Sequence, residues 1–236
     1  MSDAKLQIVQ MGTVLTLTLN RPEKLNAIDN ALAEALLDAL NAAANDSTVR
    51  AIRINANGRA FCAGRDVSKP PTERDLTLVQ AVAHAIVHHP KPVLAAVHGW
   101  VVGAGFEWML NADIVFAADD ARFKLPEASL GVFVTGGLVA TLPAAIGLNR
   151  AKALMLLGEA FDARQAADWG LLHRVLPKDE LETASLAAAQ QLAALQPEVA
   201  MQFKRVLNQV GLSQFDAAVE VESQVQRLLE RKTNRV

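Results

Sequence analysis

The chain has 236 residues, of which 51% are hydrophobic and 20% are charged. Such a chain can bury one large core and is too apolar to be disordered, so we expect one domain, or one domain with a small appendage. The 23 basic and 25 acidic residues leave a formal net charge of −2, without the basic excess of a nucleic-acid-binding protein, so a small ligand or a protein partner is expected instead.

Neither the start of the chain nor its apolar stretches indicate a membrane partner. The first five residues include an aspartate and a lysine, where a secretory signal would need an apolar core. The best apolar candidate, residues 93–118, is interrupted by a histidine and two acids and is not typical of a membrane-spanning helix. Cys62 is the only cysteine and allows no intrachain disulfide. These features predict a soluble, cytoplasmic protein.

The first part of the sequence alternates between strand and helix patterns. Residues 14–19 alternate their side chains strictly and predict a strand, and residues 51–55 predict another. Between them, Asp29 is expected to cap a helix that runs to about residue 44, because leucines recur there at helical spacing. This order of strand, helix and strand predicts an α/β fold.

The same alternation continues through the middle of the chain. A helix is expected from about residue 72 to 88, where prolines end it. Residues 93–97 are uniformly apolar, as in a strand that is covered on both faces. A glycine-rich turn then enters a predicted helix over residues 103–111, and residues 113–117 predict a further strand.

From Gly131 onward the sequence becomes mainly helical, without a low-complexity linker or an internal repeat of fixed period. Caps mark several boundaries, such as Asp162 before one helix and Gly170 after it. The predicted helices cover residues 137–146, 150–157, 162–169, 179–195, 197–210 and 213–231, and a short strand is predicted at residues 173–176.

Two acids near the glycine-rich turn form the candidate catalytic site. Glu107 follows the turn at residues 103–105, and the predicted strand at residues 113–117 would bring Glu127 back towards it. A carboxylate pair suits proton transfer, because burial or a negative neighbour keeps one acid neutral while the other stays ionised. Each motif is weak alone, since a Gly-x-Gly is more often a plain turn and a glutamate at a helix start is more often solvated.

Several separated motifs occur in one order across roughly residues 13 to 210. These stretches are Leu19–Pro22 with Leu25–Ala27, Ala60–Asp66, Lys91–Glu107, Ala112–Ile114, Ala121–Glu127, Leu130–Gly131, Leu142–Pro143 and Gly170–Leu172. As an ordered set they resemble the crotonase superfamily, the enoyl-CoA hydratase/isomerase group. The resemblance implies an α/β fold, a spiral of ββα units with its core at residues 1–176. It also implies a helical C-terminal region at residues 177–236 that is used in trimerisation, and hence a homotrimer or a hexamer.

The resemblance further implies acyl-CoA thioester substrates and an enolate-like intermediate. Backbone N–H groups at two motif positions, Arg65 and Ala104, would form an oxyanion hole, an effect on the order of 3 kcal/mol per donor. By family analogy, Glu127 gives a proton to the substrate and Glu107 holds the attacking water. Coenzyme A is part of the substrate, so no separate cofactor is expected.

Contacts with coenzyme A are likewise carried over by motif position. Lys24 and Leu25 would lie beside the adenine and the pantetheine, and the backbone of Ala63 would face the adenine. Lys204 matches a family lysine on a C-terminal helix that can reach a CoA phosphate, sometimes from a neighbouring subunit. A solvent-facing lysine on an amphipathic helix is the equal alternative for Lys204.

The acyl group is interpreted from bulky side chains and from two departures from the family pattern. The stretch Val132–Gly137 replaces the proline and several glycines that usually follow this point in the family, and the segment Asp66–Pro90 is shorter than in typical hydratases. Both regions line the acyl pocket in relatives. Trp100, Trp108 and Phe133 supply bulk nearby and favour an aromatic, cyclic or branched acyl group. Ordinary core packing explains these three side chains at least as well.

No metal site is expected, because we see no cluster of His, Asp and Glu at ligand spacing. The histidines at 84, 88 and 89 are interpreted as helix-surface or helix-end residues. Cys62 is interpreted as a small buried side chain.

The paired acids and the oxyanion-hole pattern lead to one hypothesis of function. It is the syn hydration of a 2-enoyl-CoA to a 3-hydroxyacyl-CoA, a reaction of fatty acid metabolism. The alternatives within the fold are an enoyl-CoA Δ3,Δ2-isomerase and an acyl-CoA thioester hydrolase. The alternative from another class is a non-catalytic protein that binds CoA esters.

Overall fold

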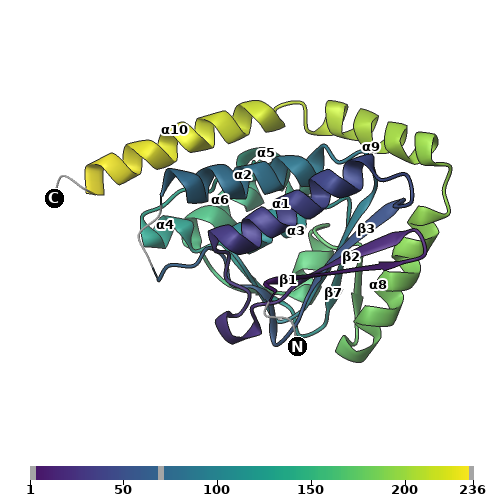
Figure 1. Ribbon diagram of the computed structural model, residues 1–236. Coiled ribbons are helices and arrows are strands. Elements are labelled where there is room, and N and C mark those ends of the chain that lie inside the picture. The colour runs from purple at the N-terminus through teal and green to yellow at the C-terminus, as the bar shows by residue number, and fades with distance from the viewer. Residues whose placement is uncertain (1–3, 69–71, 234–236) are drawn as a thin grey trace.

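The computed structural model describes residues 4–68 and 72–233 (Figure 1). Residues 1–3, part of the charged start considered above, lie outside the described residues. Within the described part, no helix is both long and apolar enough to cross a membrane.

Strands and helices alternate in the first part of the chain, and helices dominate the rest. The strands are β1 (Leu6–Met11), β2 (Val14–Leu19), β3 (Ala51–Ala56), β4 (Ala60–Cys62), β5 (Val93–Val97), β6 (Trp100–Val102), β7 (Ile114–Ala118), β8 (Arg122–Lys124), β9 (Phe161–Asp162) and β10 (Arg174–Leu176). The helices are η1 (Pro22–Lys24), α1 (Asn30–Asn45), α2 (Glu73–Val87), α3 (Ala104–Leu110), α4 (Glu127–Leu130), α5 (Leu138–Ile146), α6 (Leu148–Leu157), α7 (Ala163–Asp168), α8 (Lys178–Ala193), α9 (Pro197–Gly211) and α10 (Phe215–Thr233).

Successive pairs of strands are divided between two sheets. The larger sheet has the order β1-β2-β3-β5-β7-β10, and the smaller sheet has the order β4-β6-β8-β9. Each of β3, β5 and β7 lies in the larger sheet, and the strand that follows it, β4, β6 or β8, lies in the smaller one. A helix follows each pair, so the chain repeats a ββα unit. In the larger sheet, only the pair β1 and β2 is antiparallel.

Strand β5 shows why a uniformly apolar run suits this sheet. Val93, Ala95 and Val97 are buried in the main core, on the side of α1 to α3. The alternate residues Leu94 and Ala96 are buried in a second cluster that includes Leu181 of α8. Figure 1 shows the strands between α8 and the layer of α1 and α2. The prediction of a strand covered on both faces is therefore confirmed.

Helix starts follow their capping residues. The Asp29 side chain accepts a hydrogen bond from the Leu32 amide at 2.9 Å, which fixes the start of α1. Thr72 and Asp75 form a reciprocal capping box at the start of α2. Both predicted helices therefore begin where the sequence places them.

The sequence does not predict β1, β4, β6, β8 or β9. The last four have only two or three residues, too few to show a period. In β1 a single residue is buried, so the strand lacks an alternating pattern. Strand β6, Trp100–Val102, directly precedes the glycine turn at residues 103–105.

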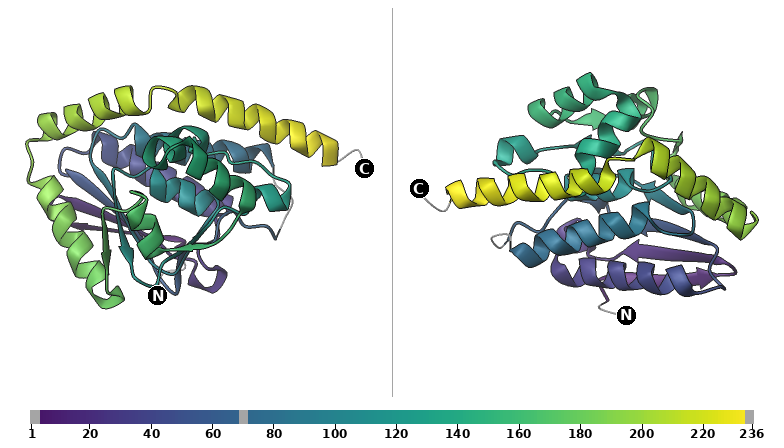
Figure 2. Two further views of the ribbon diagram at one scale, coloured as in Figure 1. Left: turned by 180° about the vertical axis from the view of Figure 1, so that it is seen from behind. Right: turned by 90° about the horizontal axis from the view of Figure 1, so that it is seen from above.

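The C-terminal helices wrap around the ββα core. Helix α8 covers one face of the larger sheet, and α9 and α10 run along one side of the molecule (Figure 2). Helix α10 packs against α5 and α2. The predicted boundary between the core and the C-terminal region, at residues 176 and 177, stays a prediction.

Candidate active site

A cavity of about 590 Å³ opens where the loops after β4 and β6 meet the segment around α4. Glu107 of α3 and Glu127 of α4 both line it. The loop over residues 63–68 forms one side, and Leu130 and Phe133 add apolar surface on the other. One cavity therefore holds both acids that the sequence predicts to be catalytic.

Two backbone amide groups point to an anion-binding role for the turns at this cavity. Arg65 and Ala104 line it, and neither N–H donates to a protein acceptor among the described residues. Arg65 is held between two hydrogen bonds of 2.8 Å, from the Ile28 amide to Gly64 O and from the Asp66 amide to Ile28 O. A Cβ atom at Gly64 would lie 3.9 Å from the Ala104 nitrogen, so the two turns adjoin. Free N–H donors beside a cavity can stabilise developing negative charge.

Glu107 is the more deeply buried acid, with a relative exposure of 1%. Its Oε1 accepts a hydrogen bond from the Thr135 amide at 3.2 Å. Its Oε2 has no hydrogen-bond partner among the described residues. Burial, followed by the charges of Glu222 and Glu127, raises the pKa of Glu107 well above its ordinary value. The structure thus favours the neutral form of this acid.

Glu127 lies against the glycine turn. A Cβ atom at Gly103 would be 2.6 Å from Glu127 Oε1, and Gly103 has a φ of +52°, so both the space and the backbone require glycine. Oε2 of Glu127 is buried without a hydrogen-bond partner among the described residues. Burial raises the pKa of Glu127 to about 7. The carboxyl group can therefore give or take a proton near neutral pH.

A third buried acid, Glu222 of α10, was missed by the sequence reasoning. It is 0% exposed and accepts hydrogen bonds from the amides of Gly137, at 2.7 Å, and Val139, at 2.8 Å. Burial raises the pKa of Glu222 to about 7. The available signal was its position: it follows buried Phe215 and Ala218 at helical spacing, on the face that should be apolar.

Gln226, one turn further along α10, also holds the wall of the cavity. Its side chain is buried and its Oε1 accepts a hydrogen bond from the Phe133 amide at 2.7 Å. Glu222 and Gln226 thus form hydrogen bonds with the segment between α4 and α5 and hold it in place. The same segment contains Thr135, whose amide donates to Glu107. Helix α10 therefore supports the acid pair from outside the ββα core.

The residues predicted to contact coenzyme A come together except for Lys204. Ala63 lines the first cavity, and its amide donates to Leu25 O at 3.0 Å. Lys24 lines a second cavity of about 440 Å³ that shares Arg65 with the first. A recess lined mainly by charged and polar residues thus adjoins the acid-lined cavity.

Lys204 lies elsewhere. Its Nζ is 2.8 Å from Asp113 Oδ2 and donates to Ile86 O at 2.9 Å, and the residue is only 8% exposed. The solvent-facing alternative is therefore wrong. Within one chain Lys204 lines hollows beside α9 rather than the two cavities above, so its contact with a CoA phosphate stays a prediction.

The structure corrects two of the three predicted acyl-pocket residues. Trp100 is 42% exposed on β6 and does not line the cavity. Trp108 is buried in the core, where its Nε1 donates to Val79 O at 3.2 Å. Core packing, the alternative interpretation, therefore explains Trp108 but not the exposed Trp100. Phe133 does line the cavity.

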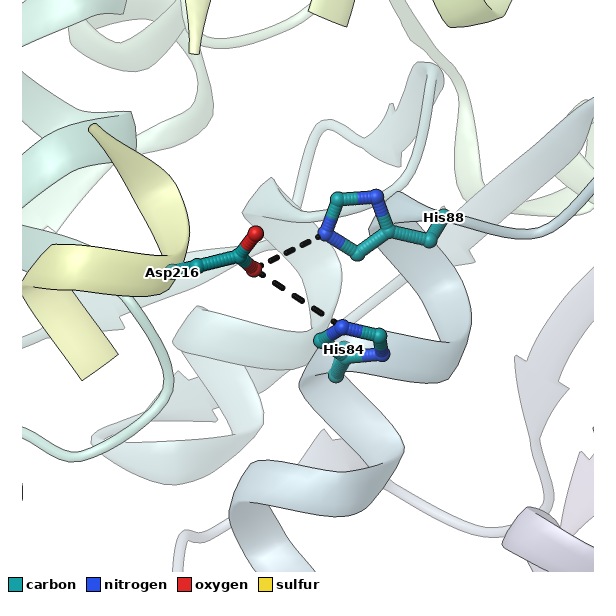
Figure 3. Close-up of side chains that lie close together, drawn as sticks. All are labelled: His84, His88 and Asp216. Carbon is teal, nitrogen blue, oxygen red and sulfur yellow. Dashed lines mark hydrogen bonds and ion pairs between the residues drawn. The ribbon is translucent and has the colours of Figure 1, made fainter. Parts of the chain in front are cut away.

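The expectation of no clustered metal-ligand residues is also wrong. His84, His88 and Asp216 place one possible ligand atom each within 4.8 Å of one another, on the surface between α2 and α10 (Figure 3). His89 is no surface residue: it is 4% exposed, and its Nε2 lies 3.1 Å from Leu40 O. Cys62 is buried as predicted, and burial raises the pKa of its thiol to about 12.

The chain is similar to known proteins over nearly its whole length. A family model described as enoyl-CoA hydratase/isomerase matches residues 10–235. The chain is 34% identical over 240 residues to 1,2-epoxyphenylacetyl-CoA isomerase of Escherichia coli K12, covering 97% of this chain and 91% of that protein. It is 35% identical over 232 residues to 2,3-dehydroadipyl-CoA hydratase of the same organism, covering 96% and 90%.

A solved structure matches at the level of the fold. It is described as an enoyl-CoA hydratase from Mycobacterium avium subsp. paratuberculosis K-10. Its TM-score is 0.91 at 30% sequence identity, and the match covers 96% of this chain and 90% of that one. The fold that the ordered motifs imply, an α/β spiral with a helical C-terminal region, is confirmed.

Proposed function

The chain belongs to the enoyl-CoA hydratase/isomerase family, the crotonase superfamily, and from this premise we propose that it adds water to a 2-enoyl-CoA to form a 3-hydroxyacyl-CoA. The observation that carries the proposal is a pair of buried carboxyl oxygens, on Glu107 and Glu127. Within the described part of the chain these oxygens have no hydrogen-bond partner, and they border one cavity with two amides that donate to no protein acceptor. Hydration needs both an acid and a base, and the pair can supply them.

The proposed course begins with the thioester oxygen against the N–H groups of Arg65 and Ala104. Water attacks Cβ as one carboxylate takes its proton, and the charge that moves to the thioester oxygen is stabilised by the two donors. The other acid, in its neutral form, then protonates Cα. Both protons stay within one cavity, from which the apolar surface of Phe133 helps to exclude bulk water.

The acid and base roles depend on which of the two carboxyl groups holds a proton. Burial raises the pKa of both acids, and the charges of Glu222 and Glu127 raise the pKa of Glu107 further, so the two acids lose their protons as coupled groups. The deeper burial of Glu107 favours the proton there, which differs from the family analogy that makes Glu127 the donor. We therefore assign the acid–base work to the pair as a unit.

A second candidate, an enoyl-CoA isomerase, is favoured by one specific observation. Glu107 is tied to the Thr135 amide and burial keeps it neutral, which leaves Glu127 as the base nearest to ionisation. A single base could move a proton between two carbons without adding water. Thioester hydrolysis by the same base, and binding of CoA esters without turnover, are the other outcomes to be separated.

The test supplies purified protein with crotonyl-CoA and with longer and aryl enoyl-CoAs. Loss of the conjugated thioester absorbance together with a product heavier by one water supports hydration. We expect this activity to be lost in Glu107→Gln and in Glu127→Gln. A shifted double bond without added water, released CoA, or tight binding without turnover would each contradict the proposal and identify the alternative.

The proposal extends to the CoA moiety, the assembly and the location. We propose that the adenosine end of CoA lies in the recess of Lys24 and Arg65. We also propose that the protein is cytoplasmic. Helix α9 exposes apolar side chains on one face, including Phe203 at 67% and Val210 at 75%, which supports burial of this face in a homotrimer or hexamer. Light scattering after size-exclusion chromatography measures the assembly.

A further inference from the structure

Three surface side chains from two helices converge outside the proposed active site. His84 lies in the last turn of α2, His88 follows as its C-cap, and Asp216 lies in the first turn of α10. Figure 3 shows the two imidazoles and the carboxylate turned towards one another. His88 Nε2 is 3.1 Å from Asp216 Oδ1, and His84 Nε2 is 3.7 Å from the same oxygen. Neither the acid pair nor the CoA recess uses these groups.

The spacing of the ligand atoms matches that around a metal ion. Ligands bound tetrahedrally to Zn²⁺ at about 2.0–2.1 Å lie about 3.3 Å apart. The two distances from the aspartate oxygen, 3.1 and 3.7 Å, bracket that value. All three possible ligand atoms fall within 4.8 Å of one another, so small side-chain rotations suffice to close the site. Histidines four residues apart on a helix project on one side, which is how two of the ligands come to be neighbours.

The helices that carry these side chains are firmly placed. Phe215, next to Asp216, is 1% exposed and packs edge-on against the His88 ring, with centroids 5.8 Å apart. A Cβ atom at Gly137 would collide with the Phe215 ring, so the start of α10 is closely fitted against the segment before α5. Helix α2 buries its opposite face in the core. Ligands on packed helices need little ordering before an ion binds.

We propose that His84, His88 and Asp216 form a surface site for a late first-row divalent cation, with Zn²⁺ as its expected occupant, that links α2 to α10. Two imidazole nitrogens with one carboxylate favour Zn²⁺, Ni²⁺ or Cu²⁺ over Mg²⁺ or Ca²⁺, which prefer oxygen ligands. The His84, His88 and Asp216 side chains are 59%, 42% and 71% exposed, so water can complete the coordination. The nearby guanidinium of Arg205 donates to Gln202 and Gln209 on its own helix.

An ion at this site would hold the start of the helix that supports the proposed active site. Glu222 and Gln226 lie further along α10 and fasten the backbone of Gly137, Val139 and Phe133. Because the ion would bind ligands from two helices in the folded state, it stabilises that state by mass action. The structural consequence is a slower opening of α10, which amide hydrogen exchange measures.

The experiment titrates untagged, metal-free full-length protein with Zn²⁺ by calorimetry, and with Co²⁺ by visible absorbance. We expect one saturable site per chain, a higher melting temperature with Zn²⁺, and slower hydrogen exchange in α10. We expect the affinity for Zn²⁺ to fall at least about tenfold in each of three variants, His84→Gln, His88→Gln and Asp216→Asn. Loss of a residue that only hydrogen-bonds to a metal ligand already lowers affinity by about this factor. His173→Gln, which removes an exposed histidine outside the cluster, serves as the matched control and should bind as the parent does.

Circular dichroism and melting without metal establish that each variant folds, so a lost site is not mistaken for a lost structure. Absence of saturable binding in the parent protein would overturn the proposal. So would an affinity that the three variants leave unchanged, or one that His173→Gln lowers equally. In those cases the cluster is only an ion pair between the histidines and Asp216.

Discussion

Helix α10 places carboxyl groups in two contrasting environments. Asp216, at its start, has a side chain that is 71% exposed beside two exposed histidines. Glu222, about 9 Å further along the helix, is 0% exposed, and burial raises its pKa to about 7. Asp216 faces water and two imidazoles and can bind a cation, whereas the exclusion of water raises the pKa of Glu222 near the acid pair. Burial therefore decides which chemistry each carboxyl group can perform.

Substitution of the buried acid pair tests this contrast with the largest expected effect. Glutamine keeps the size of Glu107 or Glu127 but cannot transfer a proton, so each substitution should lower kcat by about 10²–10⁴, the range for general acid–base groups. Steady-state hydration of crotonyl-CoA measures the loss. Glu180→Gln changes an exposed acid at the start of α8 and should leave kcat unaltered. A Glu107→Gln variant that still hydrates crotonyl-CoA at the parent's rate would remove Glu107 from the chemistry and leave Glu127 as the single acid–base group.

Substitution of Gly103 tests whether contact between a new Cβ atom and Glu127, and not backbone strain alone, lowers activity. In Gly103→Ala, the new Cβ would press on Glu127 Oε1 and shift the turn that carries the Ala104 amide. We expect kcat to fall by about 10²–10³, as when one oxyanion-hole donor is lost. Gly12→Ala is the matched control, because Gly12 has a similar φ of +60° but nothing within 4 Å of the added atom. Gly103→Ala should lose more stability than Gly12→Ala, because its new Cβ also presses on Glu127, and only Gly103→Ala should lose activity. Equal activity in the two would contradict the proposed site.

The pH dependence of stability tests the burial of Glu222. Its pKa rises from 4.5 to about 7 on folding, so the folded state binds the proton more tightly. Stability is therefore highest below pH 4.5 for this group and falls as the pH rises to about 7, by about 3 kcal/mol. Urea unfolding across this range should show a flatter profile for Glu222→Gln than for the parent. Glu220→Gln, which changes an exposed acid on the same helix, should keep the parent's slope.

The sequence predicts the acid pair and most of the elements because these depend on local patterns. Helical spacing, caps and the motif around Glu107 can all be identified within a few residues. The position of Lys204 could not be predicted in this way, because its pairing with Asp113 joins distant segments. The same is true of Glu222, whose polar side chain occupies an otherwise apolar helix face, and of Asp216, which completes a cluster begun on α2. Long-range contacts of the C-terminal helices are thus what the sequence alone leaves out.

Substitution of two aromatic residues, one inside the cavity and one outside it, should give the smallest effect, a change in substrate selectivity. Phe133 lines the acid-bearing cavity, whereas Trp100 is 42% exposed and lies outside it. Phe133→Ala should enlarge the acyl end of the cavity and raise the ratio of kcat/KM for a long or aryl enoyl-CoA over crotonyl-CoA by about tenfold, since hydrophobic pockets discriminate on this scale. Trp100→Ala should leave the ratio unchanged. If Trp100→Ala altered selectivity and Phe133→Ala did not, the acyl group would have to lie along β6 instead of against the segment that α10 supports.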